Sequence, residues 1–208
     1  NIGKVMATLE DNGFADNTLV VFLNDNGGPT WDNASVNTPL RGGKSSFFEG
    51  GIRVPFVVSW PGRIAPGRVI DTPVISLDLF PTIAGAAGLD LPEDSGLDGL
   101  DLMPLMTGRA TELPRDELFW RIRGTKGDVA LRKGDWKIYR MGQYHVTHLF
   151  NLADDPYEKT DLSKSHPEKF KEMLVRMAEW EEQMEPPRYW WSQKLFEQYK
   201  TPDTPLPR

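Results

Sequence analysis

The chain of 208 residues contains no cysteine. Disulfide bonds, thiolate metal sites and a cysteine nucleophile are therefore excluded within it. Long apolar runs are missing as well. The longest uninterrupted apolar runs are about as short as Leu19–Leu23, whereas a membrane-spanning helix needs about 20 residues. Positive charge is not in excess, because 24 Lys and Arg stand against 30 Asp and Glu for a net charge of −6. This balance disfavours a nucleic-acid-binding surface.

Aromatic and apolar residues are plentiful. Seven Trp and ten Phe, within a hydrophobic fraction of 39%, indicate a folded chain with a core. The length suggests one or two domains of about 100–200 residues each.

The chain opens on Asn1 without a basic and apolar leader. Ile2, Val5, Met6 and Leu9 follow the spacing of one helix face, with no capping sequence before them. We therefore expect a helix from the first residues to Asn12, and a further part of the protein upstream of Asn1.

The first half reads as an α/β fold. Thr18–Leu23 is a continuous β-branched and aromatic run, which is typical of a strand buried on both faces of a parallel sheet. Arg53–Trp60 predicts a second strand, and Ser76 is positioned to cap a helix over Leu77–Ala87. The inward face of that helix would hold Leu77, Phe80, Ile83, Ala84 and Ala87.

The second half changes pattern. Residues 117–121, 129–132, 136–140 and 148–152 predict four short strands of one antiparallel sheet. A helix over 166–184 should cover a face of that sheet, with a capping box at Ser165 and Glu168. Its buried side chains should be Phe170, Leu174, Met177 and Trp180.

Asn24-Asp25-Asn26-Gly27-Gly28 follows the first predicted strand directly. Open α/β sheets bind ligands at the carboxyl ends of their strands. A carboxylate beside an amide oxygen suits a hard cation such as Ca²⁺ or Mg²⁺. The alternative is a plain Asn/Asp/Gly turn after a strand.

Arg41-Gly42-Gly43-Lys44-Ser45-Ser46 offers a compact positive charge on a loop whose glycines allow close backbone packing, which suits an anion. The first glycine of a nucleotide-binding P-loop is missing, and a solvated basic loop is the alternative. We interpret Glu49 and Arg53, just beyond, as a structural pair that anchors this loop.

In chain order these features resemble the type I sulfatases, the formylglycine-dependent, arylsulfatase-like members of the alkaline phosphatase superfamily. The resemblance covers nearly the whole chain, up to about Trp180. It rests on the ordered set Thr18–Leu23, Asp25–Gly28, Pro39–Lys44, Glu49–Pro55, Trp60–Gly62, Asp78–Thr82, Leu97–Gly99, Gly134–Lys137, Leu149–Leu152 and Asp155-Pro156.

The resemblance implies a sulfuric ester hydrolase with one Ca²⁺ per complete active site. Asp25 and Asn26 match two of the family's Ca²⁺ ligands, and Lys44 matches the lysine that contacts the substrate sulfate. In the family, hydrated formylglycine attacks sulfur while Ca²⁺ and the lysine neutralise the sulfuryl oxygens. The formylglycine motif and the other metal ligands are expected upstream, so this segment alone should be inactive.

Ser59-Trp60-Pro61-Gly62-Arg63 fits the minimal pattern of that modification motif. A helix should follow the modified residue, but Pro66-Gly67 comes soon after and marks a turn instead. We therefore expect no nucleophile in this chain.

The family fold would be a mostly parallel sheet domain of the alkaline phosphatase type. Residues 1–112 would form the last part of this catalytic domain, and 113–208 a C-terminal subdomain. The substrate would be a sulfate ester, with a sulfated carbohydrate as one class, and the compartment periplasmic or extracellular. Trp31, Asn33 and Asn37 are candidates to face a sugar, with ordinary loop packing as the alternative.

Two rival functions stay open. One is a phosphodiesterase or phosphonate hydrolase of the same superfamily, although the Gly-Gly-Lys and Glu-Gly-Gly sequences fit sulfatases better. The other is a non-catalytic binding module that has lost the metal. The retention of Asp25, Asn26 and Lys44 together argues against the second.

Overall fold

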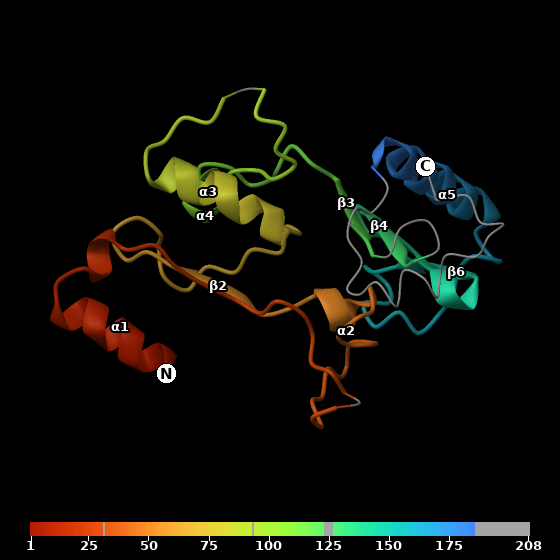
Figure 1. Cartoon of the computed structure of the whole chain (residues 1–208), viewed down its shortest axis with the longest axis horizontal. Helices are drawn as coiled ribbons and strands as arrows, with labels where there is room; N and C mark the ends of the chain where they lie inside the picture. The colour runs from red at the N-terminus through yellow and green to blue at the C-terminus, as the bar shows by residue number, and fades with distance from the viewer. Residues whose placement is uncertain (31, 93, 123–126, 186–208) are drawn as a thin grey trace. The chain divides into compact units, whose positions relative to one another are not determined.

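A computed structural model of the chain describes residues 1–30, 32–92, 94–122 and 127–185 (Figure 1). The chain divides into two compact units, each formed by two stretches of sequence. Unit 1 is Asn1–Asn24 with Pro55–Arg115, and unit 2 is Asp25–Val54 with Asp116–Arg208.

Unit 1 begins with helix α1, Ile2–Asp11, as the amphipathic pattern predicts. A short 3-10 turn, Ala15–Asn17, leads into strand β1, Val20–Leu23. Strand β2, Phe56–Ser59, pairs with β1 in antiparallel register, with Val21 opposite Val58.

The expectation that the first strand lies in a parallel sheet, buried on both faces, is wrong for the pairing within this chain. On one face of the pair, Phe22 lies opposite Val57, and these side chains are 38% and 59% exposed. On the other face, Phe56 and Val58 pack against a core that includes Trp60. An apolar β-branched run reflects strand propensity and does not itself decide how many faces are covered.

The helix predicted over 77–87 begins as a 3-10 turn, Ser76–Asp78, and continues as helix α3, Leu79–Ala86. A separate short helix, α4, lies further along the chain at Met103–Met106. Ala84 is buried as expected, but the four other predicted inward residues are exposed: Leu77, Phe80, Ile83 and Ala87.

Polar anchoring explains which face of α3 is buried. Asp78 is fully buried and accepts hydrogen bonds from the amides of Ile75 and Leu100, both at 2.9 Å. Thr82, one turn on, accepts one from the amide of Leu102 at 2.8 Å. These two side chains hold the polar side of the helix inward, so the apolar stripe faces outward in this chain.

Unit 2 contains the predicted antiparallel sheet. Its order is β3-β4-β5-β6, with every neighbouring pair antiparallel. The elements of the unit are α2 (Glu49–Ile52), β3 (Glu117–Arg121), β4 (Val129–Lys133), β5 (Trp136–Met141), a 3-10 turn (Gly142–Tyr144), β6 (Val146–Asn151) and α5 (Pro167–Gln183).

Helix α5 crosses one face of this sheet (Figure 1). Met173 and Met177 lie in a core with inward side chains of β4, β5 and β6, and Phe170 and Trp180 pack at its edge. Leu174 is 36% exposed, so its predicted burial is wrong. The capping box is wrong too: the N-cap is His166, without a side-chain cap bond, and Pro167 starts the helix.

The opposite face of the sheet packs against the segment before α2. Phe48 lies in a second core with Ala130, Tyr139 and Phe150. Its ring meets that of Tyr139 edge-on, with centroids 4.8 Å apart. The sheet therefore lies between α5 on one side and the segment 47–49 on the other.

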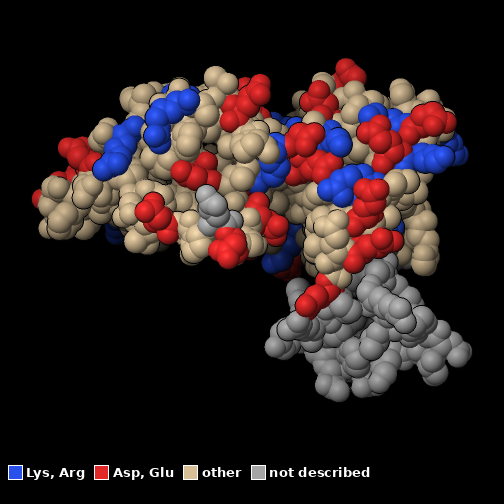
Figure 2. Space-filling model, turned by 90° about the horizontal axis from the view of Figure 1, so that it is seen from above, with Lys and Arg blue, Asp and Glu red and all other residues tan. Residues whose placement is uncertain are grey.

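By contacts, residues 25–54 group with the C-terminal sheet, whereas the predicted domain division at 112/113 stays a prediction. Acidic and basic side chains are interspersed over the face seen in Figure 2. Within the described ranges, none of the helices has the length and hydrophobicity needed to cross a membrane.

Candidate active site

Asp25 and Asn26 follow β1 after one residue, Asn24, and their side chains touch. The amide Nδ2 of Asn26 lies 3.2 Å from Oδ1 of Asp25. Asp25 is exposed and Asn26 half-buried, so an approaching ligand can reach the pair.

The two glycines that follow are fixed by backbone packing. Gly27 donates its amide to the carbonyl of Gly51 at 2.9 Å. A Cβ on Gly27 would lie 1.7 Å from the carbonyl oxygen of Gly50, which only glycine avoids. The turn after Asn26 is thus locked against α2.

The loop between the two motifs folds back on itself, as its glycines predict. The amide of Lys44 donates to the carbonyl of Gly28 at 3.3 Å, and Gly43 packs so closely that a Cβ there would lie 2.6 Å from the same oxygen. Lys44 itself is exposed. The lysine's main chain therefore returns to a point three residues beyond Asp25.

The side chain of Asn37 holds the two ends of this loop together by hydrogen bonds to its backbone. Its Oδ1 accepts the amide of Gly28 at 2.9 Å, and its Nδ2 donates to the carbonyls of Gly28 and Gly42 at 2.9 and 3.1 Å. The Asn33 side chain accepts from the amide and hydroxyl of Ser35. These bonds engage both asparagine side chains within the loop, and their contact with a sugar stays a prediction. Trp31 lies outside the described residues.

The donor chemistry of the pair fits calcium. The carboxylate of Asp25 and the amide of Asn26 carry the oxygen ligands that Ca²⁺ prefers, and a rotation of the amide would present its oxygen beside the carboxylate. Two residues fall short of the six to eight oxygens of a Ca²⁺ shell. No cluster of three or more His, Asp or Glu side chains suited to a metal occurs in the described part of the chain.

Sequence reasoning missed a buried ion cluster beneath this loop. Glu49 does face Arg53, but at 4.0 Å, whereas its Oε1 lies 2.7 Å from Nζ of Lys137. Glu158 also pairs with Lys137, at 2.9 Å. A lysine between Trp136 and Ile138 in a predicted strand was the available signal.

The segment resembling the modification motif forms a turn. Trp60 is buried and donates its indole N–H to the carbonyl of Asp16 at 3.1 Å. Gly62 packs on the same carbonyl, where a Cβ would come within 2.5 Å. Ser59 is the last residue of β2, as the turn interpretation expects.

Comparison with known proteins agrees with this arrangement of motifs. The family model described as Sulfatase matches residues 1–89. Steryl-sulfatase from Rattus norvegicus is 35% identical over 212 residues, which cover 85% of this chain and 37% of the relative. Human arylsulfatase A is 40% identical over 190 residues, covering 77% of this chain and 36% of the relative.

A solved structure shares the fold. Ps i-CgsB, in complex with k-i-k-neocarrahexaose, superposes with a TM-score of 0.82 and 33% identity over 94% of this chain and 43% of that chain. The chain thus spans well under half the length of these relatives. The family model, the relatives and the shared alkaline-phosphatase-like fold together show that the chain belongs to the sulfatase family.

Proposed function

We propose that this chain supplies the calcium-binding pair and the sulfate-contacting lysine of a sulfatase that hydrolyses sulfate esters. The observation that carries the proposal is the return of the loop, in which the Lys44 amide bonds to Gly28 just beyond Asp25 and Asn26. A cation-binding pair and an anion-binding lysine then share one short, clamped stretch of backbone.

Each group has a separate part. Asp25 and Asn26 would hold Ca²⁺, which when bound supplies positive charge next to the sulfate group. Lys44 would bind a sulfuryl oxygen and stabilise the negative charge that grows as the ester bond breaks. The glycines and Asn37 fix the loop beforehand, so these charges need little reorganisation during the reaction. The formylglycine nucleophile would come from residues outside these 208.

The substrate proposal is a sulfated carbohydrate. It is supported by the carbohydrate bound in the solved structure of Ps i-CgsB, which is similar over nearly the whole chain. Steroid and aryl sulfates are the alternatives suggested by the names of the other relatives. We further propose a periplasmic or extracellular location, following the family resemblance.

Replacement of Lys44 by alanine in the complete enzyme tests the lysine's role. Loss of one preorganised electrostatic contact lowers turnover by about 10²–10³-fold in comparable sites. An exposed side chain contributes about 0.5 kcal/mol or less to stability, so the melting temperature should hardly change. Turnover of 4-nitrophenyl sulfate and thermal melting are measured on the same preparation.

The matched control is Lys164→Ala, which removes an exposed lysine of the same unit away from the loop and should leave both quantities unchanged. Near-normal turnover in Lys44→Ala would show that Lys44 is only a solvated loop residue. A phosphate diester and a phosphonate monoester tested alongside distinguish the superfamily rival, since preference for either would reject the sulfatase assignment. Calcium binding without turnover of any ester would favour a binding module.

A further inference from the structure

Glu158 holds both ends of the segment that carries Lys44. Its main-chain carbonyl accepts a hydrogen bond from Nη1 of Arg41 at 2.8 Å. Its side-chain Oε2 accepts the backbone amide of Glu49 at 2.6 Å. One residue, more than a hundred positions later in the chain, therefore fixes where the segment 41–49 begins and ends.

Glu158 is itself rigidly placed. It is fully buried, and its backbone has the left-handed value φ = 55°, which is unfavourable for a residue with a side chain. Its amide donates to the carbonyl of Asp155 at 3.1 Å, which completes a turn after β6. Such backbone conformations persist where surrounding contacts over-determine them and are often tied to function.

Lys137 supplies the charge that makes the buried carboxylates tolerable. It projects from β5 on the face opposite α5 and is fully buried. Its Nζ lies 2.7 Å from Oε1 of Glu49 and 2.9 Å from Oε1 of Glu158. Three sequence motifs that are distant in the chain, around residues 49, 137 and 158, thus meet in one cluster.

The position of Glu49 is transmitted to the proposed site through glycines. Gly50 donates its amide to the carbonyl of Arg41 at 2.7 Å, and Gly51 accepts the amide of Gly27. A Cβ on Gly51 would come within 2.5 Å of the carbonyl of Gly43. With backbone against backbone at these points, a shift of α2 must move the residues on both sides of Lys44.

We propose that Glu158, neutralised by Lys137, is a positioning residue that sets the place of Lys44 relative to Asp25 and Asn26. The proposal rests on the proposed function of Lys44 but concerns a different residue and a different contact. The C-terminal sheet then does more than support the fold, because β5 and the turn after β6 fix the position of the anion-binding loop.

The variant Glu158→Met tests this role with little disturbance of charge. Methionine has a similar length and no branching at Cβ, and Lys137 keeps Glu49 as a balanced partner. What is lost is the acceptor for the Glu49 amide. Glu158→Gln retains an oxygen acceptor there and serves as the conservative rescue.

Glu181→Met is the matched structural control. Glu181 is also buried, and its carboxylate pairs at 2.7 Å with Arg140, from the face of β5 that is covered by α5. Both Met variants remove one buried carboxylate that pairs with a basic side chain of β5, so a general loss of stability should affect both. Only Glu158→Met should affect the loop.

Kinetics in the complete enzyme give the first readout. For 4-nitrophenyl sulfate, Glu158→Met should lower kcat/KM about ten- to a hundredfold, as small misplacements of catalytic groups do. Glu158→Gln should recover most of the rate, and Glu181→Met should leave it near the wild-type value. In a Lys44→Ala background, adding Glu158→Met should change the rate by less than about twofold, the precision with which independent effects add.

Equal rates in the two Met variants would overturn the proposal, as would a double variant in which the two losses multiply. Amide hydrogen exchange gives a readout that does not depend on sulfatase activity. Exchange at Gly27 and Gly50 should accelerate at least about tenfold in Glu158→Met but not in Glu181→Met. Unchanged exchange would reject the positioning role even in an active enzyme. An inactive wild type with this exchange pattern would reject the proposed function alone.

Discussion

At the scale of single residues, Asp25 is the proposed ligand with a full negative charge. A Ca²⁺ site depends strongly on its carboxylates, and Asn26 offers only a neutral amide. In the complete enzyme, Asp25→Ala should abolish stoichiometric calcium, as measured by elemental analysis after dialysis. Unchanged calcium content would end the assignment. Asp32→Ala, which removes an exposed carboxylate from the same loop, should retain the metal.

The sequence was informative at this scale where chemistry is local. Asp25, Asn26 and Lys44 lie in short motifs, and the Gly-Gly pairs predicted close backbone packing. The place of Lys137 in an apolar strand was a signal, but its partner and that of Glu158 could not be recognised, because residue 49 lies 88 and 109 positions away from them. Nothing in a local pattern indicates which distant backbone amide a buried carboxylate will accept.

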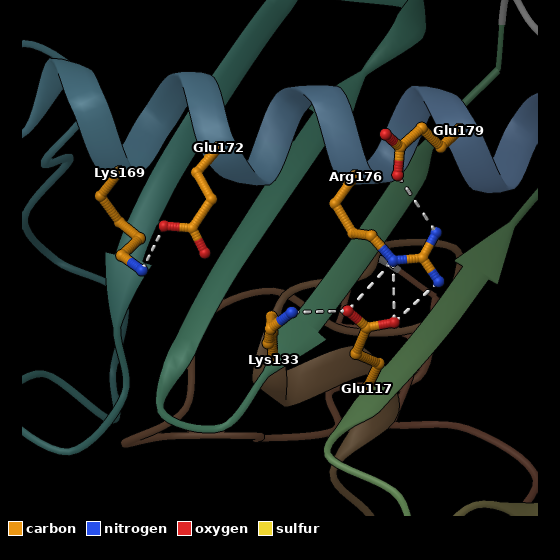
Figure 3. A network of polar contacts seen from close by, with 6 residues as sticks. All are labelled: Glu117, Lys133, Lys169, Glu172, Arg176 and Glu179. Carbon is orange, nitrogen blue, oxygen red and sulfur yellow. Dashed lines mark hydrogen bonds and ion pairs between the residues drawn. The ribbon is translucent and has the colours of Figure 1, made fainter.

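At the scale of elements, α5 is fastened to the edge of its sheet by an ion network (Figure 3). Arg176 places Nη2 2.8 Å and Nε 2.9 Å from Oε2 of Glu117, on β3. Lys133 of β4 adds a contact at 2.9 Å to the other oxygen. The Arg176 guanidinium also lies over the ring of Phe119, 5.1 Å from its centroid.

Arg176→Ala should therefore destabilise unit 2 by about 1 kcal/mol, the upper end for partly exposed ion pairs. Glu172→Ala, which loses only the exposed pair between Glu172 and Lys169, should cost about 0.5 kcal/mol or less. Urea denaturation of both variants at low and high salt provides the measurement. Salt screening should shrink the cost of Arg176→Ala, and equal costs for the two variants would contradict the fastening role.

Elements were predicted well where the pattern is periodic and the packing is local. The four strands of unit 2 and α5 lie where alternation and helical spacing put them. The buried face of α3 was missed because two polar side chains, Asp78 and Thr82, bond inward and turn its apolar stripe out. Hydrophobic periodicity identifies a helix. It does not predict which face is buried when hydrogen bonds to a buried carboxylate favour one face and apolar side chains lie on the other.

At the scale of the whole chain, each of the two units combines two separated stretches of sequence. The domain division at 112/113 that the sequence suggests stays a prediction. Within unit 2, long-range bonds join the two stretches, because Arg41 and Glu49 both reach Glu158.

Acid should affect the units through carboxyl groups with shifted pKa values. Burial acts to raise the pKa of Asp78 in unit 1, but hydrogen bonds from Arg115 and from the amides of Ile75 and Leu100 outweigh it and lower the pKa below 3.8. Its stabilising contribution is thus complete above pH 3.8 and is lost as the pH falls through the folded-state pKa. Glu158 in unit 2 behaves oppositely: burial raises its pKa, so protonation on acidification favours the folded state.

Asp78→Asn isolates the contribution from unit 1. The variant breaks the pair between the fully buried Asp78 and the largely buried Arg115, whose Nη1 and Nη2 lie 2.7 and 2.8 Å from the carboxylate, so it should lose about 3 kcal/mol at neutral pH. Thermal unfolding of wild type and variant is followed from pH 6 to pH 2.5. The stability of the wild type should fall more steeply at the acid end, so that the difference between the two proteins narrows as Asp78 becomes protonated. A difference that stays constant across this range would mean that the Asp78 carboxylate does not gain its stability from the charged pair with Arg115.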